Sequence, residues 1–195
     1  MKQERARRTY ESILDAAAEE FLLLGYAQAT LSGVVARTGM TKGALYGHFS
    51  SKEALAATLV EQGAAVWSQV LAETESSRLG PVEKLQALTV GLTNRIETDV
   101  RVRAALRLAS ELRDSIGEGD QLLRDIGWFL TSSARRAQAT EELSALHSPT
   151  AVSHLLMAVV FGYQHLAAAC RDRAALSDIE ELWEVLAYAL RGSVV

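Results

Sequence analysis

Cysteine and proline are scarce in this chain of 195 residues. The single cysteine, Cys170, excludes an intramolecular disulfide and is consistent with a reducing compartment. We read Cys170 as a small buried apolar residue. The two prolines, Pro81 and Pro149, both stand where a helix would begin, and the alternating pattern of β-strands is rare. The sequence therefore predicts an all-α fold.

Long apolar runs and export signals are also lacking. The N-terminal residues MKQERARRTY are charged and contain no apolar core of a signal peptide. The longest apolar run, residues 155–170, is shorter than the roughly 20 residues of a membrane span and contains Gln164 and His165. We therefore expect a cytoplasmic protein with no membrane partner.

Catalytic motifs are missing as well. The chain has no GxSxG, no HExxH and no glycine-rich loop for phosphates. His154 and His165 are eleven residues apart, about 16 Å along a helix, which is too far to share a metal ion. The sequence predicts no catalysis, no metal and no cofactor.

The segment 41–49, TKGALYGHF, followed by SSKEAL, contains the residue types that hold DNA phosphates. Phosphates are bound by small hydroxyls, lysines, polar aromatic residues and backbone N–H groups. Leu45 and Phe49 are four residues apart and are expected on the buried side of the same helix. The candidate phosphate-binding residues are Thr41, Lys42, Gly43, Tyr46, His48 and Lys52.

A second short helix precedes this segment. Thr30 can cap a helix that runs to Thr38, Gly39 can end it in the left-handed conformation, and Thr41 can cap the next helix. Two short helices joined by a turn with glycine form a helix-turn-helix, whose second helix enters the major groove. The residues expected in the groove are Thr41, Lys42, Gly43 and Ala44.

From the helix at residues 10–24 through residue 55, the chain resembles the tetracycline-repressor (TetR) family of bacterial regulators. The resemblance implies an N-terminal three-helix helix-turn-helix domain, residues 1–51, and a C-terminal helical ligand-binding and dimerisation bundle, residues 52–195. It implies that Thr30 and Ser32 contact the backbone or bases. It also implies that Tyr46, His48 and Lys52 meet phosphates of a double-stranded operator. Gly47 departs from the family, which usually has a bulky residue there.

The rest of the chain divides into long helices, which brings the expected total for the whole chain to about nine. Capping boxes at Ser50–Glu53 and Ser177–Glu180 begin two of them, and Gly117 and Gly119 are expected to break the chain. Apolar residues cover more than one side of the helix after Pro149, which favours a homodimer joined by a four-helix bundle. Such a dimer would read a palindrome with half-sites ~34–36 Å apart. The alternative is an enclosed monomeric core.

Charge is distributed unevenly along the chain. Residues 1–53 carry seven Lys/Arg and six Asp/Glu, against thirteen and eighteen in the remainder. Lys2, Arg5, Arg7 and Arg8 form a basic N-terminal arm. This arm either lies along phosphates or in the minor groove, or is a frayed solubilising tail.

The ligand-binding residues are predicted from aromatic positions and a second resemblance. Trp67 and Trp128 are candidate pocket walls, although core packing is the commoner explanation for an isolated tryptophan on an apolar face. The segments 102–111, 125–130 and 159–166 resemble γ-butyrolactone-type autoregulator receptors. That resemblance implies that Trp128 lies on a small hydrophobic or amphipathic signal molecule and that Arg103, Arg107 or Gln164 bonds its polar groups. Arg107 and Glu111 can alternatively form a salt bridge. Leu88 and Leu92 complete the predicted ligand set.

These patterns predict a ligand-responsive repressor that binds a palindromic operator as a dimer. A γ-butyrolactone, butenolide or furan-type autoregulator would release it. The alternatives are a helix-turn-helix regulator without a small-molecule ligand, a multidrug-sensing efflux repressor, and a helical carrier or enzyme with a chance motif.

Overall fold

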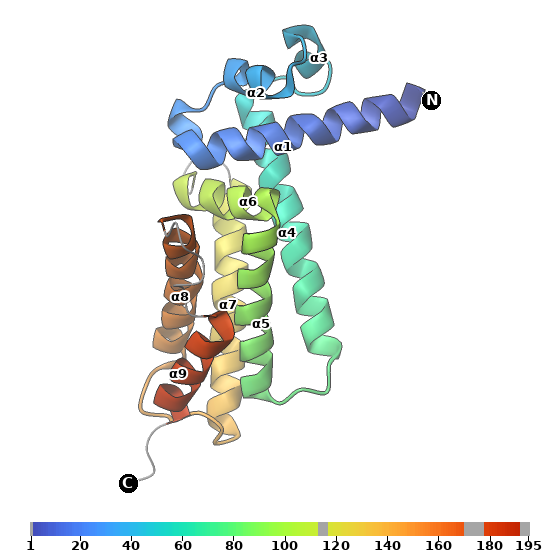
Figure 1. The fold of residues 1–195 in the computed structure, drawn as a ribbon. Coiled ribbons are helices and arrows are strands. Elements are labelled where there is room, and N and C mark those ends of the chain that lie inside the picture. Colours follow the sequence, from blue (N-terminus) through green and yellow to red (C-terminus); the bar gives the residue numbers. More distant parts are fainter. Residues whose placement is uncertain (1, 113–116, 170–177, 192–195) are drawn as a thin grey trace. The chain divides into compact units, whose positions relative to one another are not determined.

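The computed structural model describes residues 2–112, 117–169 and 178–191, and this part of the chain forms nine helices and no strands (Figure 1). The predicted all-α fold is therefore confirmed. The helices are α1 (Lys2–Gln28), α2 (Leu31–Thr38), α3 (Lys42–Tyr46), α4 (Lys52–Ser76), α5 (Pro81–Thr98), α6 (Val100–Glu111), α7 (Gly117–Ala139), α8 (Pro149–Ala169) and α9 (Ile179–Arg191).

The helices fall into two compact units. Unit 1 comprises Met1–Val66 and Thr98–Leu123, and unit 2 comprises Trp67–Glu97 and Arg124–Val195. This division differs from the predicted boundary between residues 51 and 52, because α6 and the first part of α4 belong with the N-terminal helices. The division into a DNA-binding domain and a ligand-binding and dimerisation domain at that boundary stays a prediction.

Unit 1 has a core built from α1, α2, α3, the start of α4, and α6. Ile13, Ala17 and Phe21 of α1 are buried in this core, whereas Leu24 of the same helix is exposed. Directly after Leu24, the φ of 73° and ψ of 168° at Gly25 break the helical path.

Unit 2 contains α5, α8, α9, the second part of α4 and most of α7. On α8, Leu156, Val160 and Tyr163 are buried, whereas Leu155 and Leu166 are exposed. The prediction that this helix has apolar residues on more than one side is confirmed. On α9, Ile179, Trp183 and Leu190 are buried.

Several predicted helix ends are confirmed and others are not. Pro81 and Pro149 begin α5 and α8, and the Ser148 hydroxyl accepts a hydrogen bond from Ala151 N at 3.1 Å. The expected break at Gly117 and Gly119 is wrong, because both glycines lie in the first turn of α7. The predicted cap Ser177 and the thiol of Cys170 lie outside the described residues.

None of the helices described here is both long and apolar enough to cross a lipid bilayer.

Candidate nucleic-acid interface and ligand residues

The two short helices of the predicted reading motif have the caps that the sequence indicates. Thr30 Oγ1 accepts a hydrogen bond from Gly33 N at 3.0 Å, and Thr41 Oγ1 accepts one from Ala44 N at 3.2 Å. Gly39 adopts a left-handed φ of 65° and closes α2 through its N–H to Val35 O. These bonds satisfy the N–H groups that begin each helix and fix the turn between α2 and α3.

Most of the predicted DNA-contacting residues lie on α2, on α3 or next to them and are exposed, and these exposed residues are the polar surface of the α2–α3 pair. Ala44 and Lys52 are half-buried. In each capping threonine the hydroxyl oxygen accepts from the backbone, which leaves its hydrogen available to a phosphate oxygen. The exposed members are Thr30, Ser32, Thr41, Lys42, Gly43, Tyr46 and His48.

This surface is anchored by aromatic packing beneath it. Leu45 and Phe49 are both buried, as predicted. Phe49 lies after α3 rather than within it, because that helix ends at Tyr46. The Phe49 ring stacks on Tyr10 of α1 at 5.1 Å between centroids, and His48 meets the same ring edge-on at 6.0 Å. Tyr10 therefore connects α1 to the segment that follows α3.

A part-buried ion pair that sequence reasoning missed joins α1 to α2. Glu20, which is almost fully buried, accepts a hydrogen bond from Arg37 Nε at 2.8 Å, and this bond raises the pKa of Arg37. A Cβ at Gly33 would lie 1.9 Å from Glu20 Oε1. The signal in the sequence is Gly33 itself, a poor helix former inside a short helix.

Lys52 makes contacts that the sequence did not predict. Its ammonium donates to Tyr26 O at 2.8 Å, Ala29 O at 3.1 Å and Ala27 O at 3.4 Å. It also lies 4.4 Å from the centroid of the Tyr26 ring. The three acceptors lie in the last turn of α1 and directly after it, so Lys52 holds the end of α1 and its connection to α2 in place.

The cap of α4 is one residue later than predicted. Ser51 Oγ, not Ser50, accepts from the N–H three residues ahead, Ala54 N, at 3.2 Å. Glu53 accepts from its own backbone N–H, from the Ser51 hydroxyl and from the Tyr26 hydroxyl at 3.0 Å. These bonds, in that order, lower the pKa of the Glu53 carboxyl.

The basic N-terminal arm is part of α1 rather than a frayed tail. Arg5, Arg7 and Arg8 are exposed, and Glu4 pairs with Arg7 and Arg8 at 3.8 and 3.2 Å. An α-helix is 10–12 Å across with its side chains and does not fit a minor groove about 6 Å wide. The structure thus disfavours a minor-groove arm.

Two of the predicted ligand residues lie on α6 in unit 1. Arg107 pairs with Glu111 at 2.7 Å, as the alternative interpretation predicted, and it also donates to Leu22 O. Glu111 accepts from Tyr26 N at 2.6 Å. The pair therefore holds the end of α1 around Gly25. Arg103 is half-buried.

The other predicted ligand residues lie in unit 2. Trp67, Leu88 and Leu92 are buried, and the Trp67 ring meets Phe129 edge-on at 6.3 Å. The Trp67 indole N–H has no hydrogen-bond partner among the described residues. Trp128 is 71% exposed, so it is not a core residue. The Gln164 side chain lies outside the described part.

Residues 13–59, from α1 into α4, match the family model for "Bacterial regulatory proteins, tetR family". The chain is also 31% identical over 188 residues to the A-factor receptor protein of Streptomyces griseus, a match that covers 93% of this chain and 63% of the receptor. The chain belongs to the TetR family. Its relatives are transcriptional regulators rather than enzymes, in agreement with the prediction of no catalysis.

Two solved structures are similar to this TetR-family chain over almost its whole length. One is a γ-butyrolactone receptor, an ArpA-like protein, with 27% identity, a TM-score of 0.74 and coverage of 95% of this chain and 96% of that one. The other is CprB from Streptomyces coelicolor in complex with its operator, with 27% identity, a TM-score of 0.76 and coverage of 97% and 91%. The DNA-binding helix-turn-helix of this regulator family is N-terminal, within the matched residues 13–59, which include α2 and α3.

Proposed function

We propose that this TetR-family chain is a homodimeric repressor that leaves a palindromic operator when a small amphipathic signal binds. The signal class we propose is a γ-butyrolactone, butenolide or furan-type autoregulator, acting in the cytoplasm. The observation that carries the proposal is the exposed polar surface on the capped α2–α3 pair, in a chain that resembles a receptor of A-factor. The chain spans less than two thirds of that receptor's length, so the ligand and the target operator given for this chain are proposals.

Operator contacts are assigned to that surface. Lys42 and Thr41 at the start of α3 would enter the major groove with Gly43 and Ala44, and Tyr46 and His48 would meet phosphates. Thr30 and Ser32 would contact the operator from α2. Lys52 stays a predicted phosphate contact, although its ammonium already donates to three carbonyls.

A gel shift with the DNA upstream of the protein's own gene tests these contacts. Lys42→Ala should weaken operator binding about tenfold or more, since a good base contact contributes roughly 1–3 kcal/mol. Lys84→Ala, which removes a lysine from unit 2, should bind as the unchanged protein does. Equal binding by both variants would remove Lys42 from the interface.

The homodimer is supported by exposed apolar residues on two helices of unit 2. Val185 and Tyr188 of α9 are 66% and 79% exposed, and Leu155 and Leu166 of α8 are exposed as well. Such patches on a soluble domain mark interaction surfaces. Leu182 and Leu186, whose side chains are half-buried, contribute less free surface.

Sedimentation of Val185→Glu tests this surface without disturbing the core. The variant should sediment as a monomer, because an unpaired carboxylate in a buried interface is strongly unfavourable. Ala72→Glu, which adds the same charge to an exposed position of α4, should leave the dimer intact. A dimeric Val185→Glu protein would place the interface elsewhere.

Ligand release is assigned to Trp128 and Trp67. The buried N–H of Trp67, which has no partner within the described part of the chain, can donate to a lactone carbonyl or ring oxygen. Within unit 2, Leu88 and Leu92 are proposed as an apolar wall and Gln164 as a polar contact. Arg103 and Arg107, which were also predicted as polar contacts, lie on α6 in unit 1 and stay a prediction. Trp128→Ala should keep its melting temperature, because the ring is exposed, and should lose release from the operator by a synthetic γ-butyrolactone. Normal release would exclude Trp128 from the ligand contacts.

A further inference from the structure

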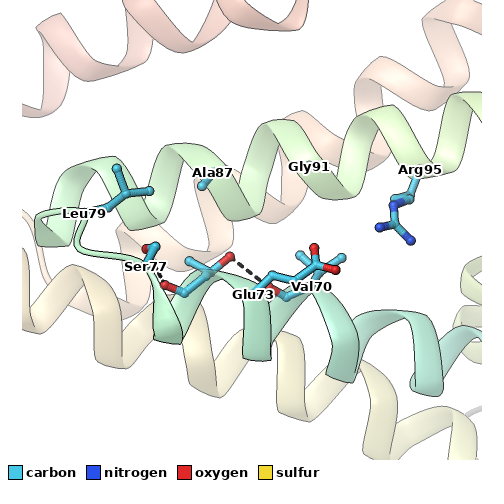
Figure 2. A pocket seen from close by; sticks show the side chains of 8 residues that line it. Val70, Glu73, Ser77, Leu79, Ala87, Gly91 and Arg95 are labelled. Carbon is cyan, nitrogen blue, oxygen red and sulfur yellow. Dashed lines mark hydrogen bonds between the residues drawn. The ribbon is translucent and has the colours of Figure 1, made fainter.

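A pocket of about 270 Å³ lies between the second half of α4 and α5, within unit 2 (Figure 2). None of the residues that the sequence singled out lines it. The lining residues are Val70, Glu73, Thr74 and Ser77 from α4, Leu79 from the connection, and Ala87, Gly91 and Arg95 from α5.

The pocket exists because α5 presents small residues to α4. Ala87 and Gly91 are one helical turn apart, and a Cβ at Gly91 would lie 3.9 Å from Val70 Cγ1. Larger side chains at these two positions would fill the space. From Ala87 to Arg95 the groove follows roughly 12 Å of α5, at 1.5 Å per residue. Its shape suits a narrow, extended molecule.

The hydroxyl groups that α4 contributes to the pocket already donate their hydrogens to backbone carbonyls. The Thr74 hydroxyl donates to Val70 O at 2.8 Å, and the Ser77 hydroxyl donates to Thr74 O at 2.6 Å (Figure 2). Glu73 accepts a hydrogen bond from Gln69 Nε2 at 2.8 Å. This wall therefore has one negative charge and hydroxyl lone pairs, which disfavour an anion beside it.

Arg95 is the only cationic side chain that lines the pocket. It is half-buried and forms no hydrogen bond or ion pair with any residue that the structure describes. A guanidinium has five N–H donors in a planar fork that matches a carboxylate. The end of the pocket at Arg95 thus fits one carboxylate.

We propose that this groove binds an aliphatic monocarboxylate. The carboxylate pairs with Arg95, and the hydrocarbon chain lies over Gly91 and Ala87 toward Leu79. Glu73 repels a second negative charge, so the groove selects a monoanion over a dianion of the same length. This inference concerns binding to unit 2 and does not rest on the proposed release from DNA.

Isothermal titration of the full chain with three probes of equal chain length tests the selectivity. Octanoate should bind, whereas octan-1-ol and octanedioate should each bind about tenfold more weakly, a difference of roughly 1.4 kcal/mol. Equal binding of octanoate and octan-1-ol would overturn the assignment of the carboxylate to Arg95. Absence of octanoate binding would overturn the proposal.

Two variants and a control test the location. Arg95→Gln should weaken octanoate binding about tenfold and leave octan-1-ol unchanged, whereas Arg135→Gln, at an exposed position of α7, should change neither. Gly91→Leu should abolish binding of both probes because its side chain fills the groove. Circular dichroism confirms that each variant is folded. Octanoate binding that is unaffected by Arg95→Gln would place the ligand elsewhere and refute the proposal.

Discussion

Replacing Lys52 by methionine separates two roles that the chain allows for this residue. Methionine keeps an unbranched apolar stem of similar length but removes the ammonium that donates to Tyr26 O, Ala27 O and Ala29 O. A hydrogen bond from a charged donor contributes roughly 1.5–3 kcal/mol. The three bonds share one charge and the longest is 3.4 Å, so we expect a loss of about 2–3 kcal/mol rather than their sum.

The loss should appear first in thermal unfolding. For a chain of this size, 1 kcal/mol corresponds to about 2–4 °C, so the melting temperature should fall by roughly 4–12 °C. Lys84→Met, which removes a lysine from unit 2, should change it little. The second measurement is the salt dependence of operator binding by the folded variant. Loss of two phosphate contacts per dimer would make the slope shallower by roughly 2, whereas a purely structural Lys52 leaves it unchanged.

We expect the melting temperature to fall and the slope to stay the same, because all three ammonium hydrogens are already engaged. An unchanged melting temperature together with a slope shallower by roughly 2 would refute this reasoning. Lys52 would then be a phosphate contact, as the family resemblance predicts, and its bonds to the carbonyls would contribute nothing measurable.

Three further outcomes are expected. Glu111→Gln should destabilise the protein by about 1–3 kcal/mol in urea denaturation, because it weakens the bonds from Tyr26 N and Arg107; no change would show that α6 does not hold the end of α1. Gly47→Ala should stabilise it by about 0.4–1 kcal/mol with unaltered DNA affinity, since φ is −68° and a new Cβ would have only ordinary contacts; a destabilised variant would contradict this. The lowered pKa of Glu53 means that its contribution is present above the ordinary pKa of 4.5 and is lost as the pH falls through the folded value. Glu53→Gln should therefore flatten the acid dependence of the melting temperature, and a parallel curve would exclude Glu53 as a cause.

The sequence predicted the reading motif well because its determinants are local. Thr30, Gly39 and Thr41 each form a hydrogen bond with a backbone group no more than four residues away. Such short spacings can be recognised directly in the amino-acid sequence. The cap of α4, which was wrongly predicted at Ser50, shows where a local sequence pattern is ambiguous. Two adjacent serines fit the same pattern, and only the backbone path selects Ser51.

The interactions that sequence reasoning missed join distant segments or involve backbone atoms. Lys52 bonds carbonyls 23 to 26 residues earlier, and carbonyls carry no residue-specific signal. Glu20 and Arg37 are 17 residues apart and share no helical period. The exposure of Trp128 depends on which side of α7 packs in unit 2. The presence of a single tryptophan in the sequence does not show which side that is.

The membership of α6 in unit 1 affects how this protein can be dissected and recombined. Ala104, Leu108 and Leu112 belong to the same core as α1, although they follow its end by more than seventy residues. A fragment that ends near residue 66 would therefore expose an apolar face of α1 and lose the hydrogen bonds from Arg107 to Leu22 O and from Tyr26 N to Glu111. A chimera that transfers the DNA specificity of this chain to another scaffold must carry residues 98–112 as a second, separate insert. Unit 1, which carries the helix-turn-helix, is built from two separate segments of the chain, and a transferred unit needs both segments to keep its core.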